Sequence, residues 1–193
     1  MKSVTVFCGT GTGNDPQFEA QAYLLGKTLA LEGITLVYGG AQIGLMGATA
    51  SGALDHRGKV TGIIPAFLLE VEIAHPGLSE LIVVETMHQR KTRMNELSEG
   101  VITLPGGFGT MEEFFEMLTW AQLGLHRKPV GILNINGFYD ELLIMIRTMV
   151  QKGFLKEIYL ELLLVSDSIP DLLDMMVHYQ PPALGKRITP DKV

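Results

Sequence analysis

The sequence predicts an α/β fold in which an open parallel sheet of about seven strands carries helices on both faces. Short runs rich in β-branched residues alternate with longer amphipathic runs, the order typical of consecutive β-α-β units. Several of the short runs carry apolar residues on both faces, as strands covered on both faces must. The two observations together indicate a sheet buried between two layers of helices.

The expected strands and helices alternate along most of the chain. Gly33, Gly58 and Gly100 each come just after a helical run, at the position where a left-handed backbone favours glycine. Helices are expected near 17–32, 44–57, 87–99, 110–125, 138–152 and 169–179. The expected strands are VTVFCG, ITLVYGG, KVTGIIP, LIVVE, GVITLPGG, KPVGILNI and LLLVSD.

Length and composition favour a single domain. The chain has 193 residues, of which 47% are hydrophobic, and this is enough for one sizeable core. We expect the domain to cover residues 1–180. Residues 181–193, PPALGKRITPDKV, combine prolines with mixed charges and are expected to form a loosely held tail.

The charge balance restricts the kinds of partner. Lys and Arg number 15 against 21 Asp and Glu, and the net charge of -6 argues against a nucleic acid polymer or an anionic membrane as partner. Any phosphate binding would have to be local. No apolar run reaches the ~18 residues of a membrane span. Cys8 is the single cysteine, so neither an intramolecular disulfide nor a cysteine-based zinc site can form. We expect a cytoplasmic protein with Cys8 as a small buried hydrophobe.

Three glycine-rich segments follow expected strands: CGTGTGND, YGGAQIGLMG and PGGFGT. In open parallel sheets, ligands bind beyond the carboxyl ends of the strands, so these segments are expected to meet at one rim. Backbone N–H groups in such loops can hold a phosphate. The candidates for this role are Gly9, Gly40, Gly44 and Gly106.

Each glycine segment also has a simpler explanation. The run GTGTGN lacks the full G-x-G-x-x-G spacing, and the second strand ends in Tyr38-Gly39-Gly40 without the acid that a dinucleotide site needs, which argues against such a site. A plain turn remains an alternative for residues 9–14. Close helix packing remains an alternative for the small residues that follow Gly44.

The run ETMHQRKTRMNEL predicts a helix that begins near Met87, because Thr86 and Gln89 form the pattern of a capping box. Arg90 and Lys91 then lie in the first turns, where the helix dipole disfavours cations. A nearby anion would remove this conflict. A solvated basic face is the alternative.

The run TLPGGFGTMEEFFEML combines a glycine turn with adjacent acids. Thr110 and Glu113 fit a second capping box, with Thr110 as N-cap. This explanation does not account for three glycines beside Pro105, which suggest N–H groups facing an anion. A ligand with a phosphate on the glycine loops and a sugar beside Glu113 would account for both the anion-binding glycines and the acid. A carboxylate beside a sugar can stabilise an oxocarbenium-like centre and orient water.

PGGFGTMEE resembles the PGGxGTxxE motif of the LOG (Lonely Guy) family, the cytokinin riboside 5'-monophosphate phosphoribohydrolases. MHQRK, YGGAQIGLMG, VEIAHPGLSEL, LTWAQLGLHRKPVGILNINGFYDELL and VFCGTGTGNDPQF are also similar to that family, in the same order over nearly the whole chain. The resemblance implies a Rossmann-like fold, a homodimer with the active site near its interface, and no metal or redox cofactor. It implies that Arg90 and Glu113 are the catalytic pair.

Further site residues are implied by the same resemblance. Two of them, Glu72 and Thr119, match weaker contact positions, where a surface acid and a helix-buried hydroxyl are the alternatives. The chain departs from the family where Gly39-Gly40-Ala41 replaces Gly-Gly-Gly and where GTGTGND replaces a Gly-Ser-Ser start, which bears on substrate preference. The implied nucleotide-binding residues are Glu72, Lys91, Gly107, Phe108, Gly109, Thr110, Met111, Glu112 and Thr119.

The function expected from this pattern is hydrolysis of the N-glycosidic bond of an adenosine 5'-monophosphate, which releases free base and ribose 5-phosphate. The sequence leaves open whether a prenylated adenine or plain AMP is preferred. A non-catalytic nucleotide or cofactor carrier on the same fold is one rival. A pyridoxal-dependent decarboxylase is another, but no lysine stands in a context suited to a Schiff base.

Overall fold

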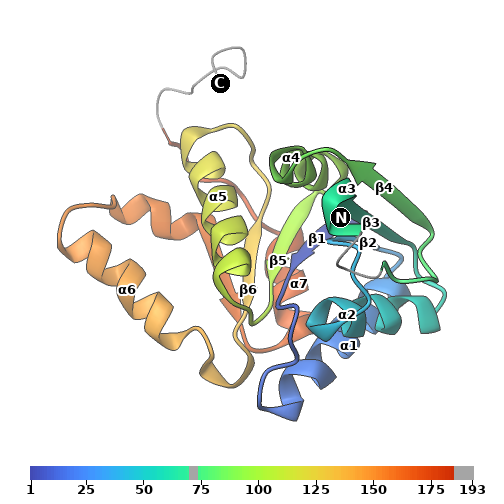
Figure 1. Cartoon of the computed structure of the whole chain (residues 1–193). Helices are drawn as coiled ribbons and strands as arrows, with labels where there is room; N and C mark the ends of the chain where they lie inside the picture. The colour runs from blue at the N-terminus through green and yellow to red at the C-terminus, as the bar shows by residue number, and fades with distance from the viewer. Residues whose placement is uncertain (70–73, 185–193) are drawn as a thin grey trace.

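Seven parallel strands form one sheet, as expected from the sequence, and their order is β4-β3-β2-β1-β5-β6-β7 (Figure 1). The computed structural model describes residues 1–69 and 74–184. Every expected strand is present. The bounds are β1 Ser3–Phe7, β2 Thr35–Tyr38, β3 Val60–Pro65, β4 Glu80–Val84, β5 Gly100–Thr103, β6 Val130–Leu133 and β7 Leu163–Ser166.

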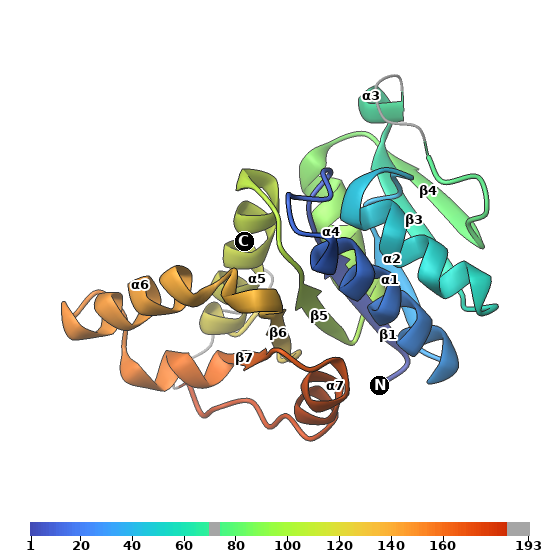
Figure 2. The same cartoon turned by 90° about the horizontal axis from the view of Figure 1, so that it is seen from below.

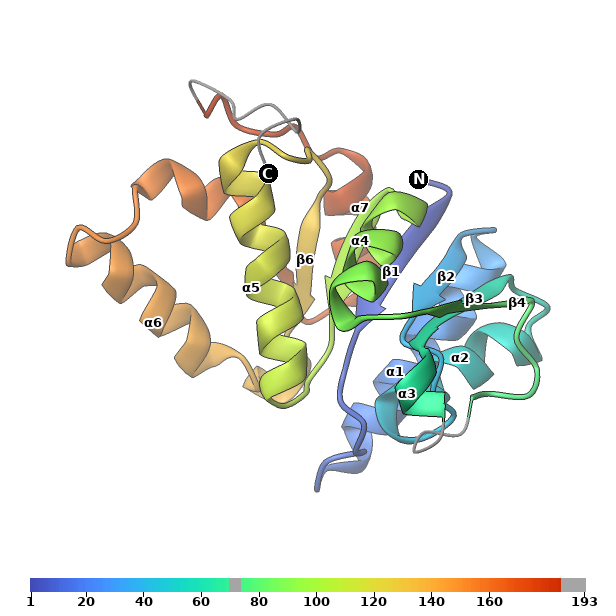
Figure 3. The same cartoon turned by 45° about the horizontal axis from the view of Figure 1, so that its top comes forward.

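Helices cover both faces of the sheet (Figure 3). One core cluster joins alternate strand residues such as Val4 and Val6 to α1, α2 and α7. The other joins Phe7 and Val101 to α4 and α5 on the opposite face. The helices are α1 Pro16–Leu31, α2 Gly44–Asp55, α3 Ala66–Leu69, α4 Met87–Leu97, α5 Phe108–Leu123, α6 Asp140–Gln151 and α7 Ile169–Val177, with 3-10 turns η1 Ile135–Gly137 and η2 Glu157–Leu162.

The topology places a switch point between β1 and β5. The chain steps outward from β1 to β4, then crosses to the other side of β1, where Phe7 pairs with Thr103. Loops that leave neighbouring strands in opposite directions open a crevice at this point. The segments after β1 and β5, which are two of the three glycine-rich segments, therefore border the same crevice.

Small residues allow α1 and α2 to pack closely. A Cβ on Gly26 would lie 1.9 Å from the Thr49 carbonyl oxygen, and one on Gly52 would lie 2.0 Å from the Tyr23 carbonyl oxygen. Helix backbones can approach this closely only where side chains are absent. Close packing thus accounts for the small residues in the body of α2.

The glycines expected to end helices do so in one case of three. Gly33 has φ +68 after α1, as expected. After α2 the left-handed residue is Arg57, with φ 60, and Gly58 instead makes room for Ala30, whose Cβ would lie 2.6 Å from an added Cβ. Gly100 is already the first residue of β5. The expectation was wrong for the last two because close packing, not backbone handedness, selects glycine there.

The two ends of the sheet differ. Figure 2 shows α6 projecting at one end, beyond β6 and β7, while β4 lies at the other. Within the described ranges, no helix is long and apolar enough to cross a membrane. Most of the expected tail, residues 185–193, lies outside the described residues, whereas 181–184 border a pocket at the C-terminal end of α5.

Candidate active site

The glycine-rich loops meet at the rim of the sheet. The Gly9 N–H donates to the Pro105 carbonyl at 3.0 Å, and the Leu45 N–H donates to the Gly9 carbonyl at 3.1 Å. Gly44 has φ +61, and a Cβ there would lie 2.2 Å from the Thr10 carbonyl oxygen. The three loops thus touch through their backbones, as the sequence predicts.

A pocket of about 280 Å³ opens between these loops. The aromatic rings of Phe18 and Phe138 form one wall and pack edge to face with centroids 5.7 Å apart. Leu45 and residues of the first and third loops form the rest. The lining residues are Gly9–Gly13, Phe18, Leu45, Pro105–Gly107 and Phe138.

The start of α5 differs from the capping box expected for Thr110 and Glu113. The helix begins two residues earlier, at Phe108, with Gly107 as N-cap and no side-chain cap. Thr110 is instead buried against Gly106, where an added Cβ would lie 2.1 Å from its hydroxyl oxygen. The capping prediction was therefore wrong, because two glycines let the helix start before the threonine.

The uncapped start of α5 strengthens the case for an anion site. The Met111 N–H makes the first bond of the helix, to the Gly107 carbonyl at 3.0 Å. The N–H groups of Phe108, Gly109 and Thr110 precede this bond, and no side chain caps them. α2 also begins at the rim without a side-chain cap. N–H groups and helix dipoles of this kind attract phosphate.

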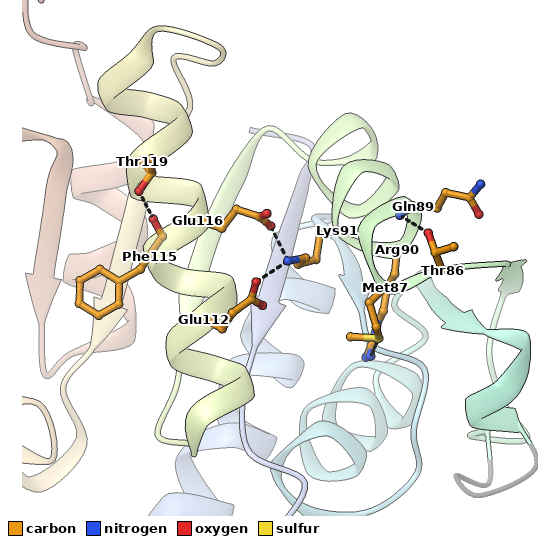
Figure 4. A network of polar contacts seen from close by, with 9 residues as sticks. All are labelled: Thr86, Met87, Gln89, Arg90, Lys91, Glu112, Phe115, Glu116 and Thr119. Atoms are coloured by element: carbon orange, nitrogen blue, oxygen red, sulfur yellow. Dashed lines mark hydrogen bonds and ion pairs between the residues drawn. The ribbon is translucent and has the colours of Figure 1, made fainter. Parts of the chain in front are cut away.

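The capping box expected at the start of α4 is present. The Gln89 N–H donates to the Thr86 hydroxyl at 3.1 Å, and the Gln89 side-chain oxygen accepts from the Glu85 N–H at 2.8 Å. The second bond goes to the residue before the N-cap instead of the N-cap itself. Figure 4 shows this helix start with Arg90 and Lys91 beyond it.

Arg90 and Lys91 are buried, which excludes a solvated basic face. Their exposed fractions are 6% and 7%. Nη2 of Arg90 donates to the Gly39 carbonyl at 3.1 Å, and Nη1 lies 3.8 Å from the Met87 sulfur. In the described part of the chain, Nε of Arg90 is buried without a hydrogen-bond partner. The guanidinium is thus held by a backbone oxygen, not neutralised by a carboxylate.

Lys91 joins α4 to α5 through two acids. Its ammonium contacts Glu112 Oε1 and lies 3.0 Å from Glu116 Oε2 (Figure 4). Burial alone would lower the pKa of Lys91, but the two carboxylates outweigh burial and leave the pKa raised. A permanently charged Lys91 is unsuited to the Schiff base of a pyridoxal enzyme.

Glu113 is the acid that remains unpaired. Among the described residues, no hydrogen bond or ion pair within 4.0 Å involves its carboxylate. Burial raises the pKa of Glu113 to about 7, with Arg90 and Lys91 opposing the rise and Glu112 and Glu116 adding to it. An acid with a pKa near neutrality beside a cation is typical of catalytic sites.

Cys8 lies in the same neighbourhood and is buried, as expected. Burial raises the pKa of its thiol, the charge of Glu113 adds to the rise, and Arg90 opposes it. The end of β1 therefore lies beneath the cation and the acid. Cys8 is neutral and adds no charge to the site.

Not every expected site residue is found at this rim among the residues that the structure describes. Glu72 lies outside the described residues. Thr119 is exposed and donates its hydroxyl to the Phe115 carbonyl at 2.7 Å, on the side of α5 away from Glu112 and Glu116 (Figure 4). Gly40, with φ +88, accepts a hydrogen bond from the His75 N–H and packs against β3, outside the pocket.

The other expected residues lie at the start of α5, near the rim of the sheet. Phe108 is 96% exposed, while Met111 is half-buried and packs on the core beneath the helix. Gly107 and Gly109 are exposed, and a Cβ on either would meet nothing within 4 Å. These positions leave the backbone at the helix start open to a ligand.

Sequence reasoning missed two residues that contact Arg90 and Lys91. Gly39 was noted as the end of a strand and as part of a departure from the family pattern, but not as a neighbour of Arg90, which occupies the space of its absent side chain. Glu116 lies one helical turn after Glu112, so this spacing was the signal that could have paired both acids with Lys91.

Comparisons with known proteins show which family the chain resembles. A family model described as "Possible lysine decarboxylase" matches residues 46–176. Cytokinin riboside 5'-monophosphate phosphoribohydrolase LOG2 of Arabidopsis thaliana is 42% identical over 181 residues, covering 94% of this chain and 85% of that protein. A cytokinin riboside 5'-monophosphate phosphoribohydrolase of Rhodococcoides fascians is 51% identical over 155 residues, covering 80% of this chain and 78% of that protein.

The chain belongs to the LOG family. The resemblance carried by PGGFGTMEE and MHQRK is thereby confirmed. Solved structures share the fold of this LOG-family chain at lower identity. A molybdenum cofactor binding protein of Rippkaea orientalis has a TM-score of 0.70 at 24% identity, covering 92% of this chain and 96% of that chain. The Moco carrier protein of Chlamydomonas reinhardtii has a TM-score of 0.69 at 18% identity, covering 92% and 96%. At these identities the likeness concerns the fold alone.

Proposed function

We propose that this chain is a phosphoribohydrolase that cleaves the N-glycosidic bond of N6-modified adenosine 5'-monophosphates into free base and ribose 5-phosphate. The observation that carries the proposal is the unpaired Glu113, with a pKa of about 7, beside Arg90 and on the helix whose uncapped start meets the glycine loops. The names of relatives 42% and 51% identical to the chain support the same reaction.

The phosphate end of the nucleotide binds at the rim. The free N–H groups at the start of α5 and the loops around Gly9 and Gly106 provide donors and a positive dipole. Because the net charge of the chain is -6, this local arrangement, and not the overall field, attracts the phosphate.

Bond cleavage takes place beside Glu113. Loss of the base leaves positive charge on the ribose, and an ionised carboxylate stabilises that charge and orients the attacking water. Arg90 positions the ligand and the carboxylate and favours the ionised form of Glu113. Each of these roles uses protein side chains alone.

A homodimer is part of the proposal. Ile144 and Met145 on α6 are 56% and 53% exposed, and exposed apolar faces favour association. Thr119 lies on the outer side of α5, so a contact between this residue and nucleotide would need a second copy of the chain. Light scattering tests this part: a dimer is expected for the wild type and a monomer for Ile144→Asp. A monomeric wild type would contradict it.

Product analysis tests the reaction. The purified protein is incubated with isopentenyladenosine monophosphate and, separately, with AMP, and free base and ribose 5-phosphate are quantified by chromatography. We expect both products in equal amounts from the prenylated nucleotide. A carrier on the same fold would bind the nucleotide and return it intact, and that result would reject the hydrolase.

A further inference from the structure

Glu116 pairs with Lys91 at the contact between α4 and α5. Its Oε2 lies 3.0 Å from the Lys91 Nζ, while Glu112 contacts the same ammonium (Figure 4). The side chains of Lys91, Glu116 and Glu112 are 9%, 20% and 55% exposed. Glu116 is therefore the more buried of the two acids, and its pairing with Lys91 is the less screened by water.

Each member of this cluster depends on the others. In the described part of the chain, Glu116 Oε2 is shielded from solvent and has no hydrogen-bond partner, so the nearby ammonium is what compensates its burial. A buried ammonium also needs compensation. Removing one partner leaves an uncompensated charge, so the pairing restricts how the two helices can shift.

The cluster adjoins the catalytic pair in sequence and in space. Arg90 precedes Lys91 on α4, and Glu113 follows Glu112 on α5. Glu112 and Glu116 are one turn apart and share a face of α5, so both reach the same lysine. Two sets of charged residues therefore lie side by side between α4 and α5. In one, Lys91 is paired with Glu112 and Glu116; in the other, Arg90 and Glu113 make no ion pair with each other.

We propose that Glu116 is a positioning residue of the active site: with Glu112 it holds the Lys91 ammonium and sets α4 and α5 in the register that places Arg90 beside Glu113. The catalytic part of this inference depends on the proposed function. The inference assigns to Lys91 a structural role in the unliganded protein, in addition to the nucleotide contact that the family resemblance implies.

The arrangement also sets the electrostatics of Glu113. The charged and titratable groups that act on its carboxylate are Arg90 and Lys91 from α4, Glu112 and Glu116 from α5, and Cys8 at the end of β1. Loss of the negative charge at position 116 removes one repulsion and leaves Lys91 less neutralised. Both changes would lower the pKa of Glu113 if the two helices stayed in place. Arg90 has a larger effect on this carboxylate than Glu116 has, so a shift of α4 that withdraws Arg90 raises the pKa instead.

The test is Glu116→Gln, which keeps shape and removes charge. The ¹³C resonance of the Glu113 carboxyl, assigned by its loss in Glu113→Gln, is titrated in wild type and variant. We expect the midpoint to rise above about 7 in Glu116→Gln, because Arg90 moves away from the Glu113 carboxyl. An unchanged or lower midpoint would overturn the inference, since loss of the Glu116 charge without displacement of Arg90 gives that result. Because this readout needs no turnover, it is independent of whether the proposed reaction is correct.

Activity gives the second readout. In Glu116→Gln we expect kcat to fall by about 10-fold, since small displacements of reacting groups are costly, and the acidic limb of the pH–rate profile to move to higher pH. Glu116→Asp keeps the charge and is expected to lie closer to wild type in both readouts. Lower activity with an unmoved limb would show a merely structural role and overturn the inference.

The matched control is Glu96→Gln. Glu96 is an exposed acid of α4 that pairs with Arg93 at 2.9 Å and lies outside the cluster. We expect its kcat, pH profile and Glu113 midpoint to match wild type. A shift as large as that of Glu116→Gln would show that any acid on these helices has the same effect, and would contradict the specific role of Glu116.

Discussion

Arg90 fills the space that a side chain at Gly39 would need. A Cβ at position 39 would lie 1.9 Å from Nη2 of Arg90 and 2.9 Å from the Met46 sulfur. The same nitrogen donates to the Gly39 carbonyl. Gly39, which follows β2, thus leaves room for the Arg90 guanidinium because it has no side chain. The role of Gly39 is therefore steric.

Gly39→Ala should therefore displace Arg90. We expect kcat/KM for base release to fall by about 100-fold, because a displacement near 1 Å at a reacting centre costs that much. The circular dichroism spectrum should stay that of the wild type. The double variant Gly39→Ala/Arg90→Ala should be no less active than Arg90→Ala alone. Additive losses in the double variant would show that Gly39 acts independently of Arg90.

Gly44 and Gly33 form a matched pair for the glycine loops. Both have positive φ, +61 and +68, but an added Cβ at Gly44 would lie 2.2 Å from the Thr10 carbonyl oxygen, whereas one at Gly33 would meet nothing within 4 Å. Gly33→Ala should cost about 1 kcal/mol of unfolding free energy. Gly44→Ala should cost more and should also raise KM, because it pushes apart the first and second loops. Equal effects in urea unfolding and kinetics would contradict the contact.

The raised pKa of Glu113 predicts a pH-dependent activity. Since the ionised carboxylate stabilises the ribosyl cation, kcat/KM should fall as pH drops through about 7. The measurement is the pH–rate profile in buffers of constant ionic strength. A profile flat from pH 8 to pH 5 would show that no group of this kind limits the reaction.

The raised pKa of Glu113 also predicts that its ionised carboxylate lowers the free energy of unfolding. A carboxyl whose pKa rises from 4.5 in the unfolded chain to about 7 in the folded protein keeps its proton preferentially when folded. Ionisation therefore destabilises the fold as pH rises from about 4.5 to about 7, by about 3 kcal/mol in total.

Glu113→Gln should reverse this cost. The variant should be more stable than wild type at pH 8 and nearly equal to it at pH 4, as measured by urea unfolding at both pH values. A variant less stable than wild type at pH 8 would mean that the carboxylate is compensated in the folded protein.

Local patterns predicted the sheet and most helices because strands such as β3 and β5 are rich in β-branched residues and buried along their whole length. The start of α5 was missed because the rule for Thr110 assumes a threonine cap, whereas the glycines before it allow an earlier start. Capping rules describe one helix end and carry no information about how closely neighbouring loops approach.

The catalytic pair could be inferred from motifs, but its surroundings could not. The partner of Arg90 is a carbonyl 51 residues away in sequence, and the first partner of Lys91 lies 21 residues away. Contacts of this kind depend on how α4 packs on the sheet and against α5. The sequence alone therefore left a solvated basic face open as an alternative, which the burial of both cations excludes.

The role of Glu113 is tested most directly by comparing nucleotide binding and turnover in the wild type and Glu113→Gln. With isopentenyladenosine monophosphate, we expect the variant to bind with an affinity close to that of the wild type in calorimetry and to release base at least about 100-fold more slowly. Release at the wild-type rate by Glu113→Gln would contradict the account.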